Sequence, residues 1–385
     1  LLAREKEIKE KGGGFYGGYT FDDDAQDAFV AELGLPPSGI DVRLVATVMD
    51  LYPSNRKLAG AAVRTFAAMA KISRKHLQDM VVGEVRPITN TLHEHARSRS
   101  VNLHVAELIH LVAQKRPELI SDGLMMMTCK SLRSSTRDAE IVCHILLSLE
   151  TFLQRATATK GPGAVNRSLA QSLPFDVLVR VGDIHHENSS VIAPLCRCME
   201  IQAFACKEYR DDFVNAGAIA VPLRVCDKAE VHTPAACAAS AEFLKVLLTE
   251  SKKAASQFMD AGGPRLLLNL LSKQSESAEV VYHSCASLAV AAQFVPVRRA
   301  LVHPQLPHTL VYMEQILRVA DTHVASVADI LPWACLAVGA LTECEHEESQ
   351  DIMRKAINPD LLQSMVTKTR SAHYSFRGDL DFCAQ

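Results

Sequence analysis

Two segments of this chain repeat one short pattern at a separation of 45 residues. Phe213 and Phe258 each begin the pattern, an aromatic residue followed by two spacers, Ala-Gly and a small residue. Each copy leads into an apolar helical run, at 221–225 and 266–271, then a polar turn and a second amphipathic helix rich in small residues. A unit repeated at this period stacks on its neighbours to bury its apolar face. The repeat therefore predicts an elongated, all-α solenoid.

Amphipathic helices can be placed end to end from residue 39 to residue 370. Their apolar residues recur at i, i+3, i+4 and i+7, the spacing of a helix that buries one face. They group into about eight units with opening turns near Gly39, Gly83, Gly123, Pro174, Gly217, Gly262, Pro304 and Pro359. The longer helix of each unit is predicted at 58–71, 101–115, 139–155, 190–209, 234–249, 278–294 and 324–343. Residues 1–38 and 371–385 are interpreted as N- and C-terminal tails.

The turns at Ala216-Gly217-Ala218-Ile219 and Ala261-Gly262-Gly263 resemble those of armadillo repeats. That family uses a glycine between its short first helix and its second, where a Cβ would clash in the sharp turn. The runs at 235–248 and 280–291 resemble the family's third helix. The resemblance is specific over 213–300, and HEAT-like helix pairs fit almost as well over 39–212. It implies an armadillo/HEAT-like α-solenoid superhelix with extended tails, a class of fold that binds other molecules more often than it transforms them.

One departure from the family's pattern bears on function. Nuclear-import and catenin-type members carry an Asn on each third helix, which holds the backbone of an extended peptide. The aligned positions here are Ala68, His110, Thr151, Ala203, Val246, Val290 and Ala340, so no Asn ladder is present. A cargo adaptor of nuclear-import type is therefore disfavoured. Recognition of partners through helices, tails or loops is expected instead.

The reactive side chains do not form a pattern typical of an enzyme. No Gly-x-Ser-x-Gly motif is present, and the glycines at 12–18 lack the Gly-Lys-Ser/Thr ending of a P-loop. The fifteen histidines include no His-Glu-x-x-His motif, and His185-His186 is interpreted as part of a solvated loop. We therefore expect no catalytic residue, no cofactor, no metal site and no small-molecule substrate.

Charge is distributed unevenly along the chain. Residues 40–170 carry a net charge of +7, whereas 1–39 carry −4 and 171–385 carry −6. Basic residues near successive helix ends are expected to line one edge of the solenoid as a stripe for an acidic protein surface or, as an alternative, for RNA. Aromatic residues that could stack on bases are almost absent from this stripe. The structural alternative is that these side chains only cap helix C-termini. The candidate partner-binding residues are Lys71, Arg74, Lys75, Arg97, Arg99, Lys115, Arg116, Arg133 and Arg137.

The N-terminal tail combines glycines with aromatic residues and an acidic run at 22–24. Such a sequence cannot bury enough apolar surface to order itself. Its aromatic residues are candidate contacts, either with a partner or with the chain's own solenoid: Phe15, Tyr16, Tyr19 and Phe21.

The eleven cysteines are odd in number and lie mostly in apolar helical runs. They are expected to be buried free thiols, which points to a reducing intracellular compartment, the cytoplasm or an organelle such as the mitochondrion. The longest apolar stretches fall well short of the ~20 residues that span a bilayer, so membrane insertion is not expected. The first residue is Leu, so the sequence does not choose between these compartments.

Together these features predict a non-catalytic scaffold or adaptor subunit of a larger assembly. It would bind other protein subunits through the solenoid surface and the tails. An accessory RNA-binding or RNA-processing factor that uses the basic residues at 71–137 is the alternative of a different class.

Overall fold

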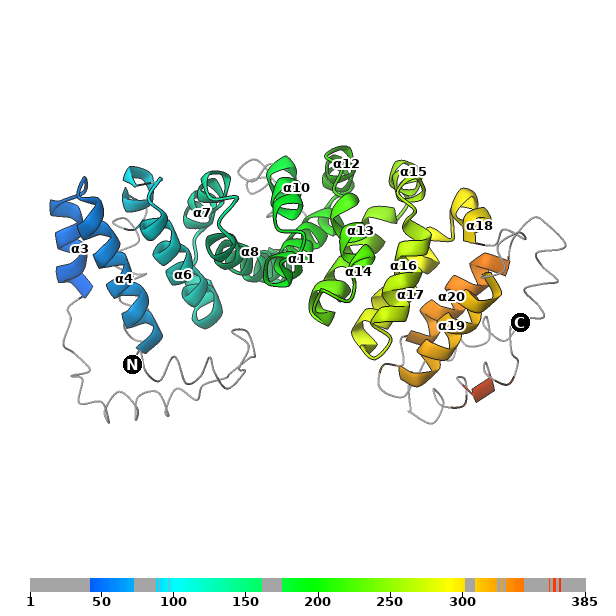
Figure 1. Ribbon diagram of the computed structural model, residues 1–385. Coiled ribbons are helices and arrows are strands. Elements are labelled where there is room, and N and C mark those ends of the chain that lie inside the picture. The colour runs from blue at the N-terminus through cyan, green and yellow to red at the C-terminus, as the bar shows by residue number, and fades with distance from the viewer. Residues whose placement is uncertain are drawn as a thin grey trace.

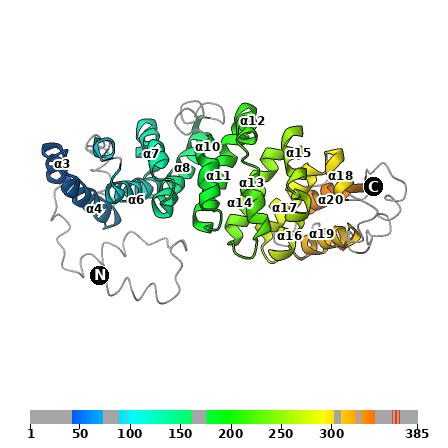
Figure 2. The same ribbon diagram turned by 45° about the horizontal axis from the view of Figure 1, so that its top comes forward.

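The computed structural model describes residues 42–72, 88, 90–95, 97–160, 175–301, 309–323, 327 and 330–342, together with 360, 363–364 and 367. Every regular element within these ranges is a helix, and the helices form one elongated row from α3 (Val42–Leu51) to α20 (Ile330–Thr342) (Figures 1 and 2). The expectation of an all-α solenoid is confirmed. The tails at 1–38 and 371–385, with Phe15, Tyr16, Tyr19 and Phe21, lie outside the described residues.

The last helix of each unit belongs to one continuous layer along the lower side of Figure 1. Each packs on the next because small and branched apolar side chains recur on both of its flanks. In chain order these third helices of the units are α4 (Arg56–Ile72), α6 (Arg99–Lys115), α8 (Ala139–Lys160), α11 (Ser189–Ala205), α14 (Pro234–Leu248), α17 (Ala278–Ala291) and α20.

Shorter helices complete each unit and lie mainly on the upper side of the layer (Figure 1). Three-helix units are clearest between residues 207 and 301, where first, second and third helices alternate. The shorter elements are η1 (Pro117–Leu119), α7 (Asp122–Ser134), α10 (Phe175–Ile184), α12 (Lys207–Asn215), α13 (Ala220–Asp227), α15 (Lys252–Asp260), α16 (Gly263–Lys273), α18 (Val295–Leu301) and α19 (Thr309–His323).

The two copies of the repeated pattern adopt the same turn. Gly217 and Gly262 have φ angles of 79° and 70°, the left-handed region that glycine occupies without penalty. Phe213 and Phe258 are both fully buried. The Phe258 ring packs directly against Gly263, and the Phe213 ring packs edge-on against Phe175 and Phe243. The glycine turn and the buried aromatic together explain why this pattern recurs between the first and second helices.

The predicted third helices agree with the observed ones in order and position, but three differ clearly in length. The helix expected at 139–155 extends to Lys160, and the helix expected at 324–343 begins only at Ile330, with Val327 outside it. The helix expected at 190–209 ends at Ala205, and a new helix begins at Lys207. The residue between them, Cys206, has extended backbone angles, φ −156° and ψ 133°. This break separates the third helix of one unit from the first helix of the next.

The alignment used to search for an Asn ladder needs correction. Four of the seven aligned positions, His110, Ala203, Val246 and Val290, are buried and face the core. Ala68 is exposed, and Thr151 and Ala340 are partly buried, so the seven positions do not share one surface. The absence of an Asn ladder does not depend on which position of the third helix is aligned. Within the described third helices the only Asn is Asn102, and its side chain is buried.

The nine described cysteines are free thiols, and seven of them are buried. Burial raises the pKa of Cys129, Cys196 and Cys285 to about 12, so these thiols are protonated at neutral pH. Over the described ranges no single helix is both long and apolar enough to span a bilayer. Only α17 taken together with α18 has the length and composition, and these two helices bend by 118° at their junction.

Candidate partner-binding site

The turn that leads into the third helix has the same backbone hydrogen bond in most units. The amide of the residue before the helix donates to the carbonyl three residues earlier. This bond joins Asn55 to Tyr52, Ser98 to His95, Asp138 to Ser135, Asn188 to His185 and Ser277 to Gln274, at N···O distances of 2.8–3.1 Å. The earlier residue of each pair therefore occupies an equivalent place in its turn.

Side chains at this place connect one turn to the turn of the preceding unit. The imidazole Nε2 atoms of His95 and His185 lie 2.8 Å from the carbonyl oxygens of Pro53 and Thr136. His323 is the last residue of α19 and has no such turn hydrogen bond among the described residues, but it makes a comparable contact, with Nε2 2.7 Å from the carbonyl oxygen of Ser275. Farther along the row, Gln274 Nε2 donates to the carbonyl of Ala229 at 2.6 Å. We call His95, His185, Gln274 and His323 the turn ladder.

The turn ladder corrects the interpretation of His185 as part of a solvated loop. Its side chain is buried and hydrogen-bonded across the unit boundary, whereas the neighbouring His186 is 39% exposed. Before α14 a different residue forms the equivalent link. There His232 Nδ1 lies 3.1 Å from the hydroxyl oxygen of Ser189. Histidines that appear scattered in the sequence thus share a structural role.

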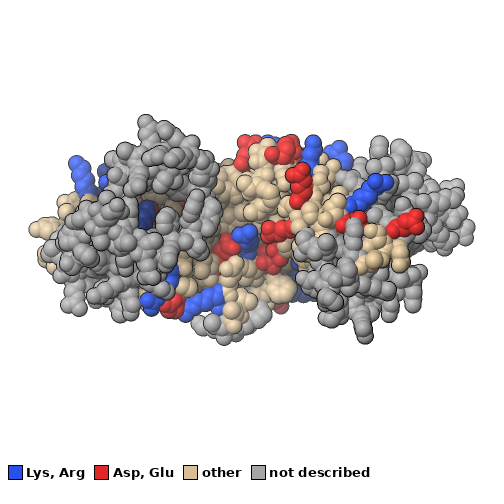
Figure 3. All heavy atoms as spheres, turned by 90° about the horizontal axis from the view of Figure 1, so that it is seen from below, with Lys and Arg blue, Asp and Glu red and all other residues tan. Residues whose placement is uncertain are grey.

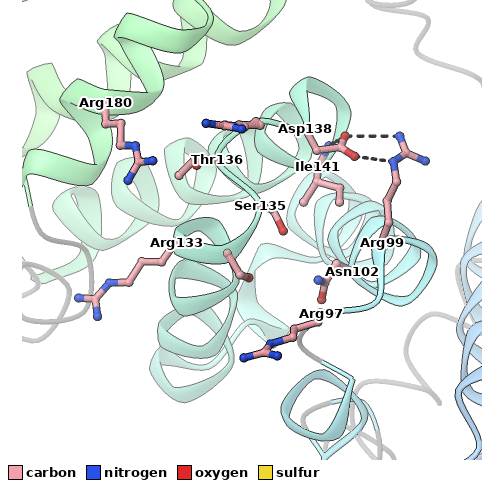
Figure 4. Close-up of a pocket in the computed structure, with 11 residues that line it drawn as sticks. Arg97, Arg99, Asn102, Arg133, Ser135, Thr136, Asp138, Ile141 and Arg180 are labelled. Carbon is pink, nitrogen blue, oxygen red and sulfur yellow. Dashed lines mark hydrogen bonds and ion pairs between the residues drawn. The ribbon is translucent and has the colours of Figure 1, made fainter.

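The α7–α8 turn is different, because the ladder position holds Ser135. Its side chain is too short to reach the preceding turn, and within the described residues the two turns are linked instead by the ion pair of Arg99 with Asp138, 2.5 Å between Nε and Oδ2. A depression of about 500 Å³ opens at this turn (Figure 4). We call it the arginine pocket, and it is lined by Arg97, Arg99, Asn102, Arg133, Ser134, Ser135, Thr136, Arg137, Asp138, Ile141 and Arg180.

Three stretches of the chain bring five arginines to this pocket. Arg97 and Arg99 lie at the start of α6, Arg133 lies in the last turn of α7 with Arg137 in the α7–α8 turn that follows, and Arg180 comes from α10. Figure 4 shows Arg133 and Arg180 on one side of Ser135 and Thr136, Arg97 below them, and Arg99 turned toward Asp138 at the opposite rim. All five arginines are exposed residues.

Asp138 is the only carboxylate that lines the pocket, and it is already engaged. It accepts hydrogen bonds from Arg99 and from the backbone amide of Ile141, which makes it the N-cap of α8. Arg99 also contacts Glu140 at 3.2 Å, and these two acidic partners raise the pKa of the Arg99 guanidinium. Arg97, Arg137 and Arg180 have no ion pair with any carboxylate of the described residues, so they give the pocket an excess of positive charge.

The expected single stripe along one edge is wrong, because the residues lie at opposite ends of α6. Arg97 and Arg99 are at its N-terminal end, while Lys115 and Arg116 are at its C-terminal end. A helix of 17 residues separates those ends by about 25 Å. Of the other candidates, Lys71 lies at the end of α4, and Arg74 and Lys75 lie outside the described residues.

The basic residues at the C-terminal ends have local partners. Lys71 forms an ion pair with Glu107, at 2.5 Å. Lys115 donates to the carbonyl oxygens of Ala70 and Lys71, each at 3.4 Å, and Arg116 pairs with Glu118. Here the structural interpretation, capping of helix C-termini, accounts for the basic side chains.

Arg180 is the pocket residue that sequence reasoning missed. It lies 43 positions after Arg137, beyond the basic third of the chain, in a segment whose net charge is negative. The repeat period could have identified Arg180, because residues about one unit apart in the sequence are neighbours in a solenoid.

The face formed by the third helices has a different character, with acidic residues over its centre (Figure 3). Glu150 of α8 pairs with Arg197 of α11 at 3.4 Å, and Glu242 lies 4.0 Å from Lys245 on α14. Burial and the nearby carboxylate of Glu242 raise the pKa of Glu200 to about 7. This face therefore offers mixed and partly neutralised charge, in contrast to the arginine pocket.

The described histidines, cysteines and carboxylates include no group of three that could hold a metal ion. The rings of His110 and His144 lie in contact at a tilt of 45°, with centroids 5.4 Å apart, and burial together with the His144 charge lowers the pKa of His110 to about 4. His110 is therefore neutral at pH 7 and packs in the core.

Comparison with known proteins identifies the fold. No family model and no curated protein matches the chain. A solved structure from work on a phosphorylation switch that controls the interaction between cadherin and β-catenin aligns with a TM-score of 0.65 at 13% identity, over 94% of this chain and 78% of that one. This is an armadillo-like helical-repeat fold.

Other similar structures are engineered proteins. One aligns with a TM-score of 0.54 at 18% identity, over 90% of this chain and 87% of its own length. A designed armadillo repeat protein in complex with the peptide (KR)4 aligns at 0.49 and 16% identity, over 66% of this chain and all of that chain. At these identities the comparisons show the armadillo-like fold, and the chain's partners follow only from its own surface.

Proposed function

We propose that this chain is a non-catalytic scaffold subunit that binds an acidic segment of another protein at the arginine pocket. An armadillo-like solenoid is typical of protein-binding scaffolds, because stacked units expose a long surface built on a rigid core. The proposal also places the protein in a reducing intracellular compartment, which its free, largely buried cysteines support.

The observation that carries the proposal is where the arginines lie relative to the helices. Cations are favoured at helix C-termini and disfavoured at N-termini by the helix dipole. Arg97 and Arg99 stand at the N-terminus of α6, and Arg137 stands just before Asp138, the N-cap of α8. Capping therefore does not explain them, whereas an external anion would stabilise all three.

RNA is the weaker candidate ligand. Protein surfaces that bind single-stranded RNA usually place aromatic side chains against the bases. The eleven residues that line the arginine pocket include no Phe, Tyr, Trp or His, and Ile141 is the only apolar one. A protein segment that supplies acidic groups fits this lining better.

The test is recovery of partners with the full-length chain and a charge-reversed variant. We expect at least one co-purifying protein to be lost when Arg97, Arg137 and Arg180 are all changed to Glu. The matched control reverses three exposed basic residues elsewhere on the solenoid, Lys252, Arg265 and Lys273.

Both variants should retain the helical circular-dichroism spectrum of the parent. Partners recovered equally with the parent and both variants would refute a role for the pocket. Loss of the partner after nuclease treatment would instead favour the RNA alternative.

A further inference from the structure

We propose that the arginine pocket is a phosphate site, which receives the phosphorylated side chain of a Ser or Thr in the protein partner. This inference rests on the proposed function, since it assumes that the pocket binds a protein. It adds the chemical group that is recognised and the reason why the pocket exists in this unit.

The space for a phosphoryl group comes from the gap in the turn ladder. In neighbouring units an imidazole or a carboxamide crosses from one turn to the preceding one, with N···O distances of 2.6–2.8 Å. Ser135 occupies the equivalent place in the α7–α8 turn and leaves the volume of about 500 Å³ open. The fold itself does not require this opening, because a His or Gln side chain fills the equivalent place in other units.

The charge around this space favours a dianion. Among the described residues, Arg97, Arg137 and Arg180 have no carboxylate within ion-pair distance, while Arg99 is engaged by Asp138 and Glu140. A single Asp or Glu carboxylate of a partner would offset only part of this charge. A phosphoryl group carries nearly two negative charges and three acceptor oxygens, which match the planar donor fork of arginine.

Hydroxyl groups complete the donor set. Ser135 and Thr136 line the pocket with side chains that form no hydrogen bond to any other described residue. The carbonyl of Thr136 accepts the hydrogen bond of His185 from the next unit, which fixes the backbone of this turn. The two hydroxyls are thereby held on the pocket wall, where each can donate to a phosphate oxygen.

The sharpest variant fills the gap with the residue that the fold uses in other units. Ser135→His keeps every arginine and adds a ring like those of His95 and His185. It should leave the fold intact and place a ring across the gap between the two turns, where the phosphoryl group would lie. The second variant changes Arg97, Arg137 and Arg180 to Gln, and its control changes Lys252, Arg265 and Lys273 to Gln.

The probe is a set of fluorescent peptides with a fixed central phosphoserine and mixed flanking residues, compared with the same set carrying Ser or Glu at the centre. Fluorescence anisotropy with the full-length chain should show at least tenfold tighter binding of the phosphoserine set. Ser135→His and the arginine variant should each lose that preference, and the control should retain it. Circular dichroism checks that each variant is folded.

Equal affinity for the phosphoserine, Ser and Glu sets would overturn the phosphate assignment, and so would full binding by Ser135→His. If phosphatase treatment leaves co-purification of an arginine-dependent partner unchanged, the proposed function stands and the phosphate site fails. If no partner depends on the arginines, both fail. Stronger competition by single-stranded RNA, or by phosphoinositide vesicles, than by phosphopeptide would also overturn the assignment.

Discussion

The turn ladder makes a quantitative prediction at His185. In His185→Ala the carbonyl of Thr136 loses a donor at 2.8 Å in a buried setting, since Thr136 is 7% exposed. Leaving a buried carbonyl without a partner costs about 1–3 kcal/mol. The lost burial of the imidazole adds about 1 kcal/mol. We therefore expect the contact between the α7–α8 and α10–α11 units to weaken by about 2–4 kcal/mol.

The assay is hydrogen exchange read by mass spectrometry, because a repeat array can open locally without unfolding as a whole. Peptides that cover 132–142 and 181–192 should exchange faster in the variant, while peptides in α16 and α17 should not change. Urea unfolding followed by circular dichroism gives the global effect.

Two matched variants isolate the hydrogen bond. The adjacent His186 is partly exposed and contacts Asp183 and Glu187, its near neighbours in sequence, so His186→Ala should change stability by less than about 0.5 kcal/mol. Gln274 forms the equivalent link with a carboxamide, so His185→Gln should keep most of the parent stability. The reasoning would be refuted if His185→Ala and His186→Ala were equally mild, or if Gln were no better than Ala.

Three further predictions test the turn glycines, the third-helix face and the thiols. Gly217→Ala and Gly262→Ala should each cost about 1–2 kcal/mol in urea unfolding, because both residues have positive φ and an added Cβ meets no atom within 4 Å. Glu200 has a folded pKa of about 7 against an ordinary 4.5, so its ionisation should cost stability as pH rises between those values. Glu200→Gln should thus stabilise the protein by up to about 3 kcal/mol at pH 8 and have little effect at pH 4.5, measured by urea titration at both. Native maleimide labelling read by mass spectrometry should modify the half-buried Cys206 well before the fully buried Cys129, whose thiol pKa is raised by burial.

Much of the fold could be predicted from sequence because the solenoid repeats local patterns. Apolar periodicity located the third helices to within a few residues at most ends, and the Ala-Gly turns at 217 and 262 indicated where the chain reverses. The missed break at Cys206 has a clear reason. Residues 206–212 contain no Pro or Gly that would mark a helix end, and the break appears only in the extended backbone of Cys206.

The candidate site was only partly predictable. Arg97, Arg99, Arg133 and Arg137 were among the residues selected by charge, but so were Lys71, Lys115 and Arg116. The helix starts predicted from sequence are uncertain by a few positions. Sequence spacing alone therefore does not distinguish a basic residue just before a helix from one just after it. The structure separates Arg97 and Arg99 from Lys115 and Arg116 because α6 begins at Arg99 and ends at Lys115. Arg133 reaches the pocket from the last turn of α7.

The sequence by itself determined the kind of molecule, a row of helical units whose turns need glycine and whose third helices need small apolar residues. Only the tertiary structure decided which side chains of different units meet. The register between stacked units decides whether His185 is a solvated loop residue or a link to Thr136. It also decides whether Ser135 opens a pocket that Arg180 completes. That register is set by packing of helices about 45 residues apart, which no local pattern encodes.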